Sequence, residues 1–275
     1  MHFPQPDGVK TTVVLNDIHL PYHNVNCLNA VKDFLDDVRP SGLVLNGDIV
    51  DFFELSTHNK GSVSLLEGKR ISRTWEVAAH EVAELVDAAG AQCKFRKFVR
   101  GNHEERLYRW LAEADHSVFQ GDMAFDLESR LYLPKHGIEL VPGEWPDAGV
   151  QVGKLWVTHG QYCTLYHAKK HLDKYRHSVM YGHTHTPQTH HVSTLHGQQA
   201  AYGLGWLGDK DSDAHKYADR VNSWVHGFGL VHTWPDGSYT AHQINFWRGV
   251  FVYGGRTYGR RTKLSLPVSP VVAHV

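Results

Sequence analysis

The sequence predicts an α/β protein with two β-sheets, and three observations lead to this prediction. Short apolar runs typical of buried strands alternate with helical patterns as far as residue 114. The first such unit, residues 11–46, has the length of a strand–helix–strand crossover, so its two strands are expected to be parallel. Beyond Pro134 strand patterns predominate, and we expect a second sheet there.

The first crossover begins with a strand over residues 11–16, because TTVVLN is a β-branched and apolar run. Apolar side chains then recur at helical spacing over residues 24–38, and Pro40 ends this helix. The run GLVLN at residues 42–46 supplies the second strand. Neither strand alternates with polar residues, which is typical of a sheet covered on both faces.

The alternation continues after an interruption. Residues 52–71 contain glycines and basic side chains without periodicity, and we expect a long loop there that caps the substrate. A helix is predicted over residues 72–89, with Gly90 as its stop. A strand over residues 94–99 and a helix over 105–114, with acidic residues early in its first turn, follow.

The second half is predicted to be mainly β-structure, with Asp236-Gly237 as a hairpin turn. The length of 275 residues favours one large domain, here residues 1–253, over two. Residues 254–275 are expected to form a basic, loosely ordered tail; its arginines could contact phosphate backbones, but a solvated tail is the simpler expectation. The further strands are expected at residues 138–141, 155–158, 179–181, 190–195, 225–234 and 239–246.

Composition excludes several classes of protein. A net charge of −1 and a pI near 7.1 give no overall field for nucleic acid or anionic membranes, so any such affinity needs a local patch. The three widely spaced cysteines argue against a disulfide framework and against a cysteine zinc site. No leader-like run and no stretch of ~18 apolar residues occurs, so we expect a cytoplasmic protein without a membrane partner. Oligomeric state is left open.

Five short polar clusters follow predicted strands. Because the carboxyl ends of strands in an open α/β sheet converge on one crevice, side chains distant in sequence can meet there. Carboxylate oxygens and imidazole nitrogens together suit divalent transition metals, and histidine, present 22 times, is the commonest metal ligand. The clusters are Asp17-Ile18-His19, Gly47-Asp48, Gly101-Asn102-His103-Glu104, Thr158-His159-Gly160 and Gly182-His183-Thr184-His185.

These clusters resemble the motifs of the calcineurin-like metallophosphoesterase superfamily, and they follow the same order along the chain. The motifs are D-x-H, G-D, G-N-H-E, H-G and G-H-x-H. The resemblance spans residues 17–185. It implies two packed mixed β-sheets flanked by helices, a four-layer αββα sandwich. It also implies a hydrolase of phosphate esters that uses two divalent metal ions, with Mn²⁺ the first expectation and Fe, Zn, Ni, Co or Mg as alternatives.

The resemblance also assigns roles to individual residues, with Asp48 bridging the two ions. His103 would hydrogen-bond the phosphate and protonate the leaving oxygen, while water or hydroxide between the ions attacks phosphorus in line. Taken one at a time, histidines such as His19 or His159 would be ordinary hydrogen-bonded core residues, and His103 a surface residue. One ion would be held by Asp17, His19, Asp48 and His185, and the other by Asp48, Asn102, His159 and His183.

The expected class of phosphate ester depends on a few positions at which members of the superfamily differ from one another. Protein phosphatases of the superfamily usually show glycine after D-x-H and arginine in G-D-x-x-D-R-G, where this chain has Leu20 and Phe52. The stretches Gly182–Pro187 and Asp51–Phe53 look more like those of its phosphodiesterases and nucleases. We therefore expect a phosphodiesterase acting on DNA, RNA or nucleotides. The alternatives are a phosphomonoesterase, including a protein phosphatase, and a non-catalytic metal-binding scaffold.

Three other patterns occur in the sequence. Gly203–Gly208 matches G-x-G-x-x-G, but the polar residues after it are a poor helix start, which argues against a nucleotide fingerprint. His167 and His171 share a helix face, and a solvated helix surface is expected there. The long loop combines basic and aromatic residues that could grip phosphate and stack bases, or form a solvated loop; they are Lys60, Lys69, Arg70, Arg73, Phe52, Phe53 and Trp75.

Overall fold

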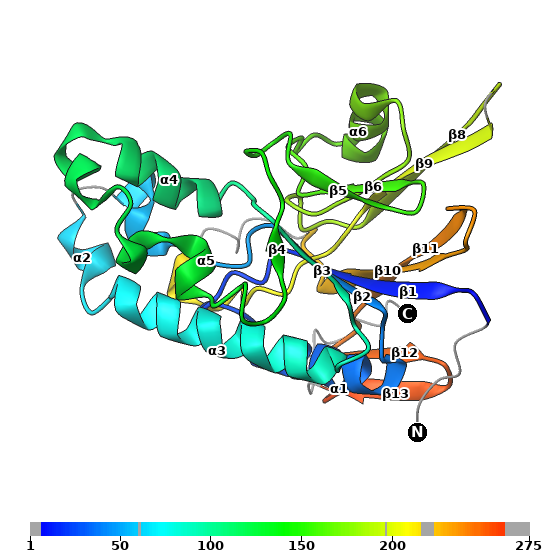
Figure 1. The fold of residues 1–275 in the computed structure, drawn as a ribbon, viewed down its shortest axis with the longest axis horizontal. Coiled ribbons are helices and arrows are strands. Elements are labelled where there is room, and N and C mark those ends of the chain that lie inside the picture. The colour runs from blue at the N-terminus through cyan, green and yellow to red at the C-terminus, as the bar shows by residue number, and fades with distance from the viewer. Residues whose placement is uncertain (1–6, 60–61, 196, 216–222, 262–275) are drawn as a thin grey trace, which may run out of the picture.

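The computed structural model describes residues 7–59, 62–195, 197–215 and 223–261. Two β-sheets pack face to face, and helices cover both outer surfaces (Figure 1). The four-layer α/β prediction is therefore confirmed. Among the described residues, every helix is too short or too polar to cross a membrane.

The first sheet is six-stranded and mixed, in the order β11-β10-β1-β2-β3-β4. Its centre is parallel, with Val14 of β1 opposite Val44 of β2, and β10 joins the other edge of β1 antiparallel. The turn at Asp236-Gly237 connects β10 to β11, as predicted. The strands are β1 (Lys10–Leu15), β2 (Gly42–Asn46), β3 (Phe95–Val99), β4 (Glu139–Leu140), β10 (Gly227–Thr233) and β11 (Tyr239–Asn245).

The second sheet is five-stranded, in the order β5-β6-β7-β9-β8. Its three central strands, β6, β7 and β9, are parallel, and the two edge strands are antiparallel to their neighbours. The strands are β5 (Gly149–Val152), β6 (Leu155–Thr158), β7 (Val179–Tyr181), β8 (Gln188–Thr194) and β9 (Gly197–Gly203).

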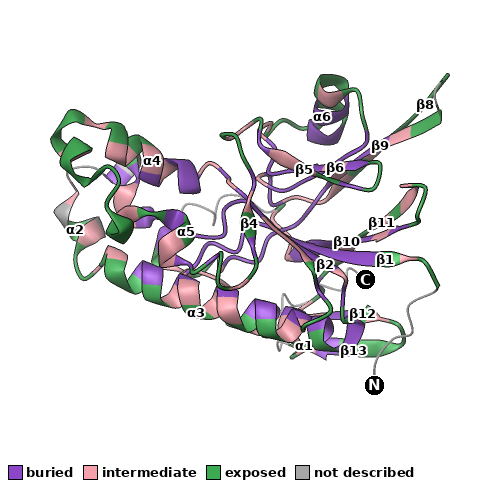
Figure 2. Cartoon of the chain, in the orientation of Figure 1, coloured by how far each residue is buried: buried purple, intermediate pink, exposed green. Residues whose placement is uncertain are grey.

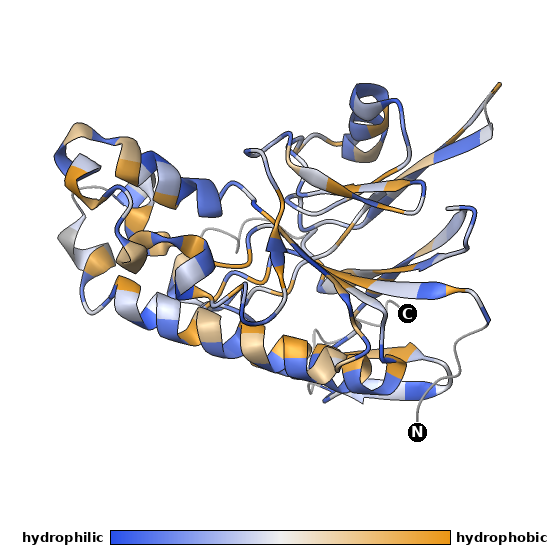
Figure 3. Cartoon of the chain, viewed as in Figure 1, coloured by the Kyte–Doolittle hydropathy of each residue, from blue (hydrophilic) through white to orange (hydrophobic). Residues whose placement is uncertain are grey.

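Helices α1 (Val25–Val38) and α3 (Ile71–Ala89) cover the outer face of the first sheet, and α6 (His167–Tyr175) covers that of the second. Buried, apolar residues recur among exposed, polar ones along α3 (Figures 2 and 3), and the buried ones belong to the core beneath the first sheet. The remaining helices are α2 (Val63–Leu66), α4 (Glu104–Ala112), α5 (Leu127–Arg130) and the 3₁₀ turns Phe53–Leu55, Thr57–Asn59, Ala114–Phe119 and Met123–Phe125.

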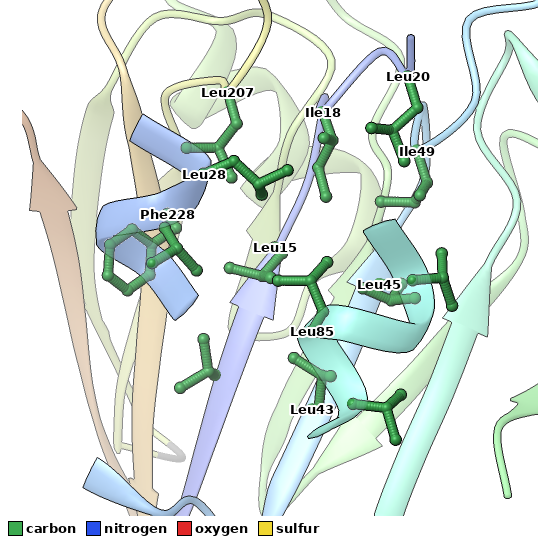
Figure 4. Close-up of a cluster of buried hydrophobic side chains, with 14 of the residues drawn as sticks. Leu15, Ile18, Leu20, Leu28, Leu43, Leu45, Ile49, Leu85, Leu207 and Phe228 are labelled. Carbon is green, nitrogen blue, oxygen red and sulfur yellow. The ribbon is translucent and has the colours of Figure 1, made fainter. Parts of the chain in front are cut away.

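Alternate side chains of the central strands enter two different cores. Leu15 and Leu45 point to the helices, where they pack with Leu28 and Leu85 (Figure 4). Val14 and its neighbours on the opposite face pack between the sheets. Each fully buried leucine contributes about 1.5–3 kcal/mol relative to exposure. The central strands therefore form a rigid base for the loops at their carboxyl ends.

The structure corrects two boundaries. Residues 52–71 are not a featureless loop, because two 3₁₀ turns and α2 interrupt them. The loose tail does not begin at residue 254, because β13 (Arg256–Gly259) pairs with β12 (Val250–Tyr253) as a hairpin. Residues 262–275 lie outside the described part of the chain.

The β12–β13 hairpin is attached to α1. The rings of Phe251 and Tyr258 lie 5.5 and 5.4 Å from that of Phe34, measured between centroids. The Tyr258 hydroxyl donates a hydrogen bond of 2.9 Å to Asp37, which also pairs with Arg256. This contact, made by a buried tyrosine, orders residues that the sequence assigned to a tail.

We expect Tyr258→Phe to lower the free energy of unfolding by about 1 kcal/mol, since a buried carboxylate loses one donor while Arg256 remains. Urea unfolding followed by circular dichroism measures the change. Tyr132→Phe, at a side chain that is 55% exposed, is the matched control. Equal midpoints for the two variants would show that the hairpin is not held by this bond.

Candidate metal centre

The five polar clusters all lie at one edge of the sandwich. They begin within two residues of the carboxyl ends of β1, β2 and β3 in the first sheet and of β6 and β7 in the second. Because these strands are parallel within each sheet, their carboxyl ends meet at the same edge. The structure thus brings together seven side chains predicted as metal ligands, Asp17, His19, Asp48, Asn102, His159, His183 and His185.

The first half of the cluster contains Asp17, His19 and His185, whose ligand atoms lie within 4.8 Å of one another. His185 Nε2 is 3.1 Å from Asp17 Oδ1 and 3.3 Å from His19 Nε2. All three residues are buried. Two imidazole nitrogens and a carboxylate oxygen that face one point inside a protein form a donor set suited to a divalent metal.

The second half is built around Asp48. Its Oδ2 is 3.2 Å from His159 Nε2, and His183 completes a group whose ligand atoms lie within 4.8 Å. The side-chain oxygen of Asn102 lies 3.1 Å from the same His159 nitrogen. Asp48 also approaches His103, and a further group joins it with His103 and His19 of the first half. Asp48 therefore lies between the two halves.

The backbone at the site is unusual. Of the ten non-glycine residues with positive φ among the described residues, five are candidate ligands, a concentration expected where surrounding structure enforces strain for function. Gly101 and Gly182 pack so tightly on the carboxylates of Asp48 and Asp17 that a Cβ at either would collide with them. The five left-handed ligands are Asp17, His19, Asp48, His183 and His185.

A second tier of residues orients these ligands. His19 Nδ1 lies 2.8 Å from Asp51 Oδ2, and His159 Nδ1 lies 3.0 Å from the carbonyl of Asn46. If each Nδ1 carries the proton, each Nε2 presents its lone pair to the cluster, the usual arrangement of metal-ligating histidines. The sequence did not single out Asp51 as a functional residue. Its position three residues after Asp48 was the available signal.

Glu104 ties two of the loops together. Its carboxylate accepts hydrogen bonds from the backbone N–H groups of Asp48, Ile49, Val50 and Gly101, at 2.8–2.9 Å. The side chain is fully buried. Burial raises the pKa of this carboxyl to about 7, and the hydrogen bonds from Val50 and Gly101 oppose the rise. The glutamate of the G-N-H-E motif thus fixes the loop that carries Asp48.

The charges of the cluster are strongly coupled. Burial opposes ionisation of Asp17, but the charges of His185 and His159 outweigh it and lower its pKa to about 2. Burial likewise opposes protonation of His159, yet Asp48 and Asp17 raise its pKa to about 10. Burial lowers the pKa of His183 to about 4. Two buried carboxylates thus create a negative potential at His159 that favours a cation, which fits the predicted metal centre.

The cluster opens into a cavity of about 580 Å³ that is lined by Asp48, Asn102, His103, His183 and His185 among others. His103 Nδ1 lies 2.9 Å from the carbonyl of Asp51. Burial opposes protonation of His103, but the carboxylate of Asp48 raises its pKa. The structure therefore places a histidine with a raised pKa at the wall of the cavity.

Arg106 is a further residue that the sequence did not single out. Its Nη1 donates to the carbonyl of Asp51 at 3.0 Å, and its Nη2 lies 2.9 Å from His103 Nε2. It is the one lysine or arginine among the described residues that line the cavity. Its position one helical turn after His103 is a signal that could have been used.

The aromatic and basic residues of the loop lie in separate places, and the alternative of base stacking is wrong for two of them. Phe52 and Trp75 are buried and pack on each other at 4.9 Å between ring centroids, which leaves no face for a base. Phe53 does line the metal cavity. Lys69, Arg70 and Arg73 line a separate cavity of about 550 Å³. Lys60 lies outside the described residues.

The expectation of a solvated surface at His167 and His171 is also wrong, because both are buried. His167 Nδ1 lies 2.6 Å from the hydroxyl of Tyr181. His171 stacks on the Tyr181 ring at 3.7 Å and accepts from the N–H of Gln161 at 3.1 Å. These contacts hold the loop that follows His159.

The G-x-G-x-x-G stretch, Gly203–Gly208, packs against two of the candidate ligands. Gly203 ends β9, and no helix starts within residues 204–211. Instead, Trp206 stacks on His185 at 4.8 Å, and the N–H of Leu207 donates to the carbonyl of Asp17 at 2.9 Å. The glycines serve close packing, because a Cβ at Gly208 would collide with the Trp206 ring and one at Gly205 with the carbonyl of Val225.

The sequence model of the family described as calcineurin-like phosphoesterase matches residues 10–234, which include all five clusters. The chain is also 25% identical over 271 residues to "Gene 54 protein" of Mycobacterium phage D29, covering 90% of this chain and 95% of that protein. It is 24% identical over 196 residues to the protein of the same name from Mycobacterium phage L5, covering 64% and 69%.

Solved structures with a similar course of chain include a Vps29 single mutant from Entamoeba histolytica, with 14% identity and a TM-score of 0.38. That match covers 86% of this chain and 99% of the other. The nuclease MPE of Pseudomonas putida matches with 10% identity and a TM-score of 0.34, covering 84% and 87%.

Proposed function

Because the chain belongs to the calcineurin-like phosphoesterase family, we propose that it is a metal-dependent phosphoesterase that hydrolyses phosphodiesters of nucleic acids or nucleotides. One observation carries the proposal. Seven side chains of ligand type, from loops after five strands, converge beneath one cavity of about 580 Å³. Burying this many coupled charges without a cation would be costly, which makes a purely structural role a poor explanation.

In this proposal two divalent ions share Asp48, and Mn²⁺ is the first candidate for both. Bound there, they would neutralise phosphate charge and lower the pKa of a coordinated water. The ligand sets are those that the family resemblance implies: one ion would take Asp17, His19, Asp48 and His185, and the other Asp48, Asn102, His159 and His183. The groups Asp17–His19–His185 and Asp48–His159–His183, and the contact of Asn102 with His159, support this division.

The chain's own residues supply the rest of the chemistry. His103 lines the cavity, and its ring, once protonated at Nε2, would donate that proton to the departing ester oxygen. Asp51 contacts the ring's Nδ1 and fixes its orientation. Arg106 Nη2 donates to His103 Nε2 at 2.9 Å, so this nitrogen can take up its proton only when a bound phosphate attracts the guanidinium away from it.

The residue at position 52 supports the proposed preference for diesters, because it replaces the arginine of the G-D-x-x-D-R-G motif of the superfamily's protein phosphatases. Phe52 occupies that place, and its ring is buried against Trp75 and does not line the cavity. A monoester dianion would lack that guanidinium, whereas a diester carries one negative charge less. Phosphomonoesterase activity, protein phosphatase included, is the alternative because the G-N-H-E stretch is phosphatase-like.

The proposal is tested by comparing bis-p-nitrophenyl phosphate, p-nitrophenyl phosphate and single-stranded DNA as substrates in Mn²⁺. We expect the highest kcat/KM for the diesters. A higher value for the monoester would establish the phosphomonoesterase instead. Purified protein that holds no metal and hydrolyses none of the three after Mn²⁺ is added would be a non-catalytic scaffold.

We expect His103→Ala to lower kcat by ~10²–10⁴-fold, the usual contribution of a general acid, while the metal content stays unchanged. The loss should be larger for a dinucleotide than for bis-p-nitrophenyl phosphate, because nitrophenolate leaves without a proton. His80→Ala, at an exposed position of α3, is the control. Equal losses for both leaving groups would assign His103 to phosphate binding only.

A further inference from the structure

We propose that α4 carries a second phosphate site, with Arg109 as its cation, and that the substrate is therefore a single-stranded polynucleotide. The inference rests on the proposed function, because it extends the substrate beyond the phosphate that is cleaved. It names a contact to the neighbouring phosphate of the same strand, outside the predicted metal centre.

The metal cavity does not end at His103. A second cavity of about 150 Å³ shares Ser56, Asn102 and Arg106 with it and continues along α4 to Arg109 and Trp110. A ligand that fills both cavities must pass Arg106. The two hollows thus form one track, which starts at the predicted metal ligands and follows the first two turns of the helix.

Arg106 and Arg109 are three residues apart on α4, so they are neighbours on the same helix face. Arg109 is exposed, and its guanidinium donates to two main-chain oxygens, Asn102 O and Glu105 O, both at 3.2 Å. These bonds hold the guanidinium beside the track without neutralising it. Since a guanidinium has five N–H donors, it can bind a phosphate oxygen as well.

The second cavity, at about 150 Å³, has room for a phosphate and its sugar but not for a duplex, so it suits a single strand. Trp110 also lines it, but its ring is already stacked on His116 at 4.0 Å between centroids, so the contact proposed here is to phosphate and not to a base. Glu113 lines the same cavity, 3.7 Å from His116 Nδ1, and Arg109 is the group there that attracts phosphate. A small diester such as bis-p-nitrophenyl phosphate would occupy only the metal cavity.

The test compares Arg109→Ala with Lys169→Ala, which removes an equal charge from the exposed side of α6 on the far sheet. For single-stranded DNA we expect Arg109→Ala to lower kcat/KM by about tenfold more than for bis-p-nitrophenyl phosphate. Its binding to a fluorescein-labelled phosphorothioate strand in Mn²⁺ should show a salt slope shallower by about 0.7. Lys169→Ala should match the unsubstituted protein in both assays.

Arg109→Gln keeps a donor at the position of Nε, which bonds the Glu105 carbonyl, but not the charge, so the same loss is expected and the metal content should not change. If Arg109→Ala and Lys169→Ala bind the strand equally, with equal salt slopes, the second site does not exist, although the phosphodiesterase stands. If the unsubstituted protein hydrolyses no phosphate ester, the proposed function fails, and the binding comparison still decides the role of Arg109.

Discussion

Asp48→Asn is expected to abolish hydrolysis of bis-p-nitrophenyl phosphate and to reduce the metal content of the purified protein. Asp48 lies between the two halves of the cluster, with Oδ2 3.2 Å from His159 Nε2 and 3.7 Å from His103 Nε2. The substitution removes one negative charge from the position shared by both proposed ions. The loss of turnover should exceed the ~10²–10³-fold cost of removing a single preorganised donor.

The measurements are steady-state turnover in Mn²⁺ and elemental analysis of the same preparation. Asp33→Asn removes an equal charge from the exposed side of α1 and is the matched control. A variant at residue 48 that retains turnover and metal at the level of this control would refute the assignment of Asp48 as the bridging ligand.

The second large effect is expected for stability. Glu104→Gln should lower the free energy of unfolding by about 3 kcal/mol, because its carboxylate accepts four buried backbone N–H groups, two on each oxygen. A glutamine amide would turn its NH₂ group towards two of these donors. The loop that carries Asp48 would lose its anchor, so metal affinity should fall as well.

Urea unfolding in the presence of a metal chelator measures the stability change apart from any effect of bound metal. Glu144→Gln is the control, because this residue is exposed and accepts hydrogen bonds from Asp147 and Ala148 through its main-chain carbonyl, which the substitution keeps. If both variants unfold at the same urea concentration, Glu104 does not hold the loop in the way its contacts indicate.

The parallel half of the fold could be predicted from the sequence because its strands are continuous apolar runs. TTVVLN and GLVLN can only be read as the two strands of a crossover, because the apolar residues between them recur at helical spacing. β9, with the sequence GQQAAYG, was missed because it is polar and bounded by glycines, and only its pairing with β7 and β8 makes it a strand. The β12–β13 hairpin was missed for a similar reason, since its aromatic side chains are explained only by Phe34 of α1.

The candidate ligands could be predicted because their motifs follow strands whose ends must converge. The residues that orient these ligands could not be predicted from the sequence. Asp51 joins His19 and His103, and it also lies 3.4 Å from His215, a residue more than 150 positions further along the chain. No local pattern marks such a contact, because it arises only when loops of both sheets meet. Arg109 could likewise not be predicted as a functional residue, because only the structure shows that α4 lies beside the cavity.

The central claim, that this cluster holds two metal ions, is tested most directly by an anomalous difference map from crystals grown with Mn²⁺. The account predicts two peaks that share Asp48, one beside Asp17 and His185 and the other beside His159 and His183. A map without peaks at these residues, or with density only at the nearby group of His19, Asp51 and His215, would contradict it.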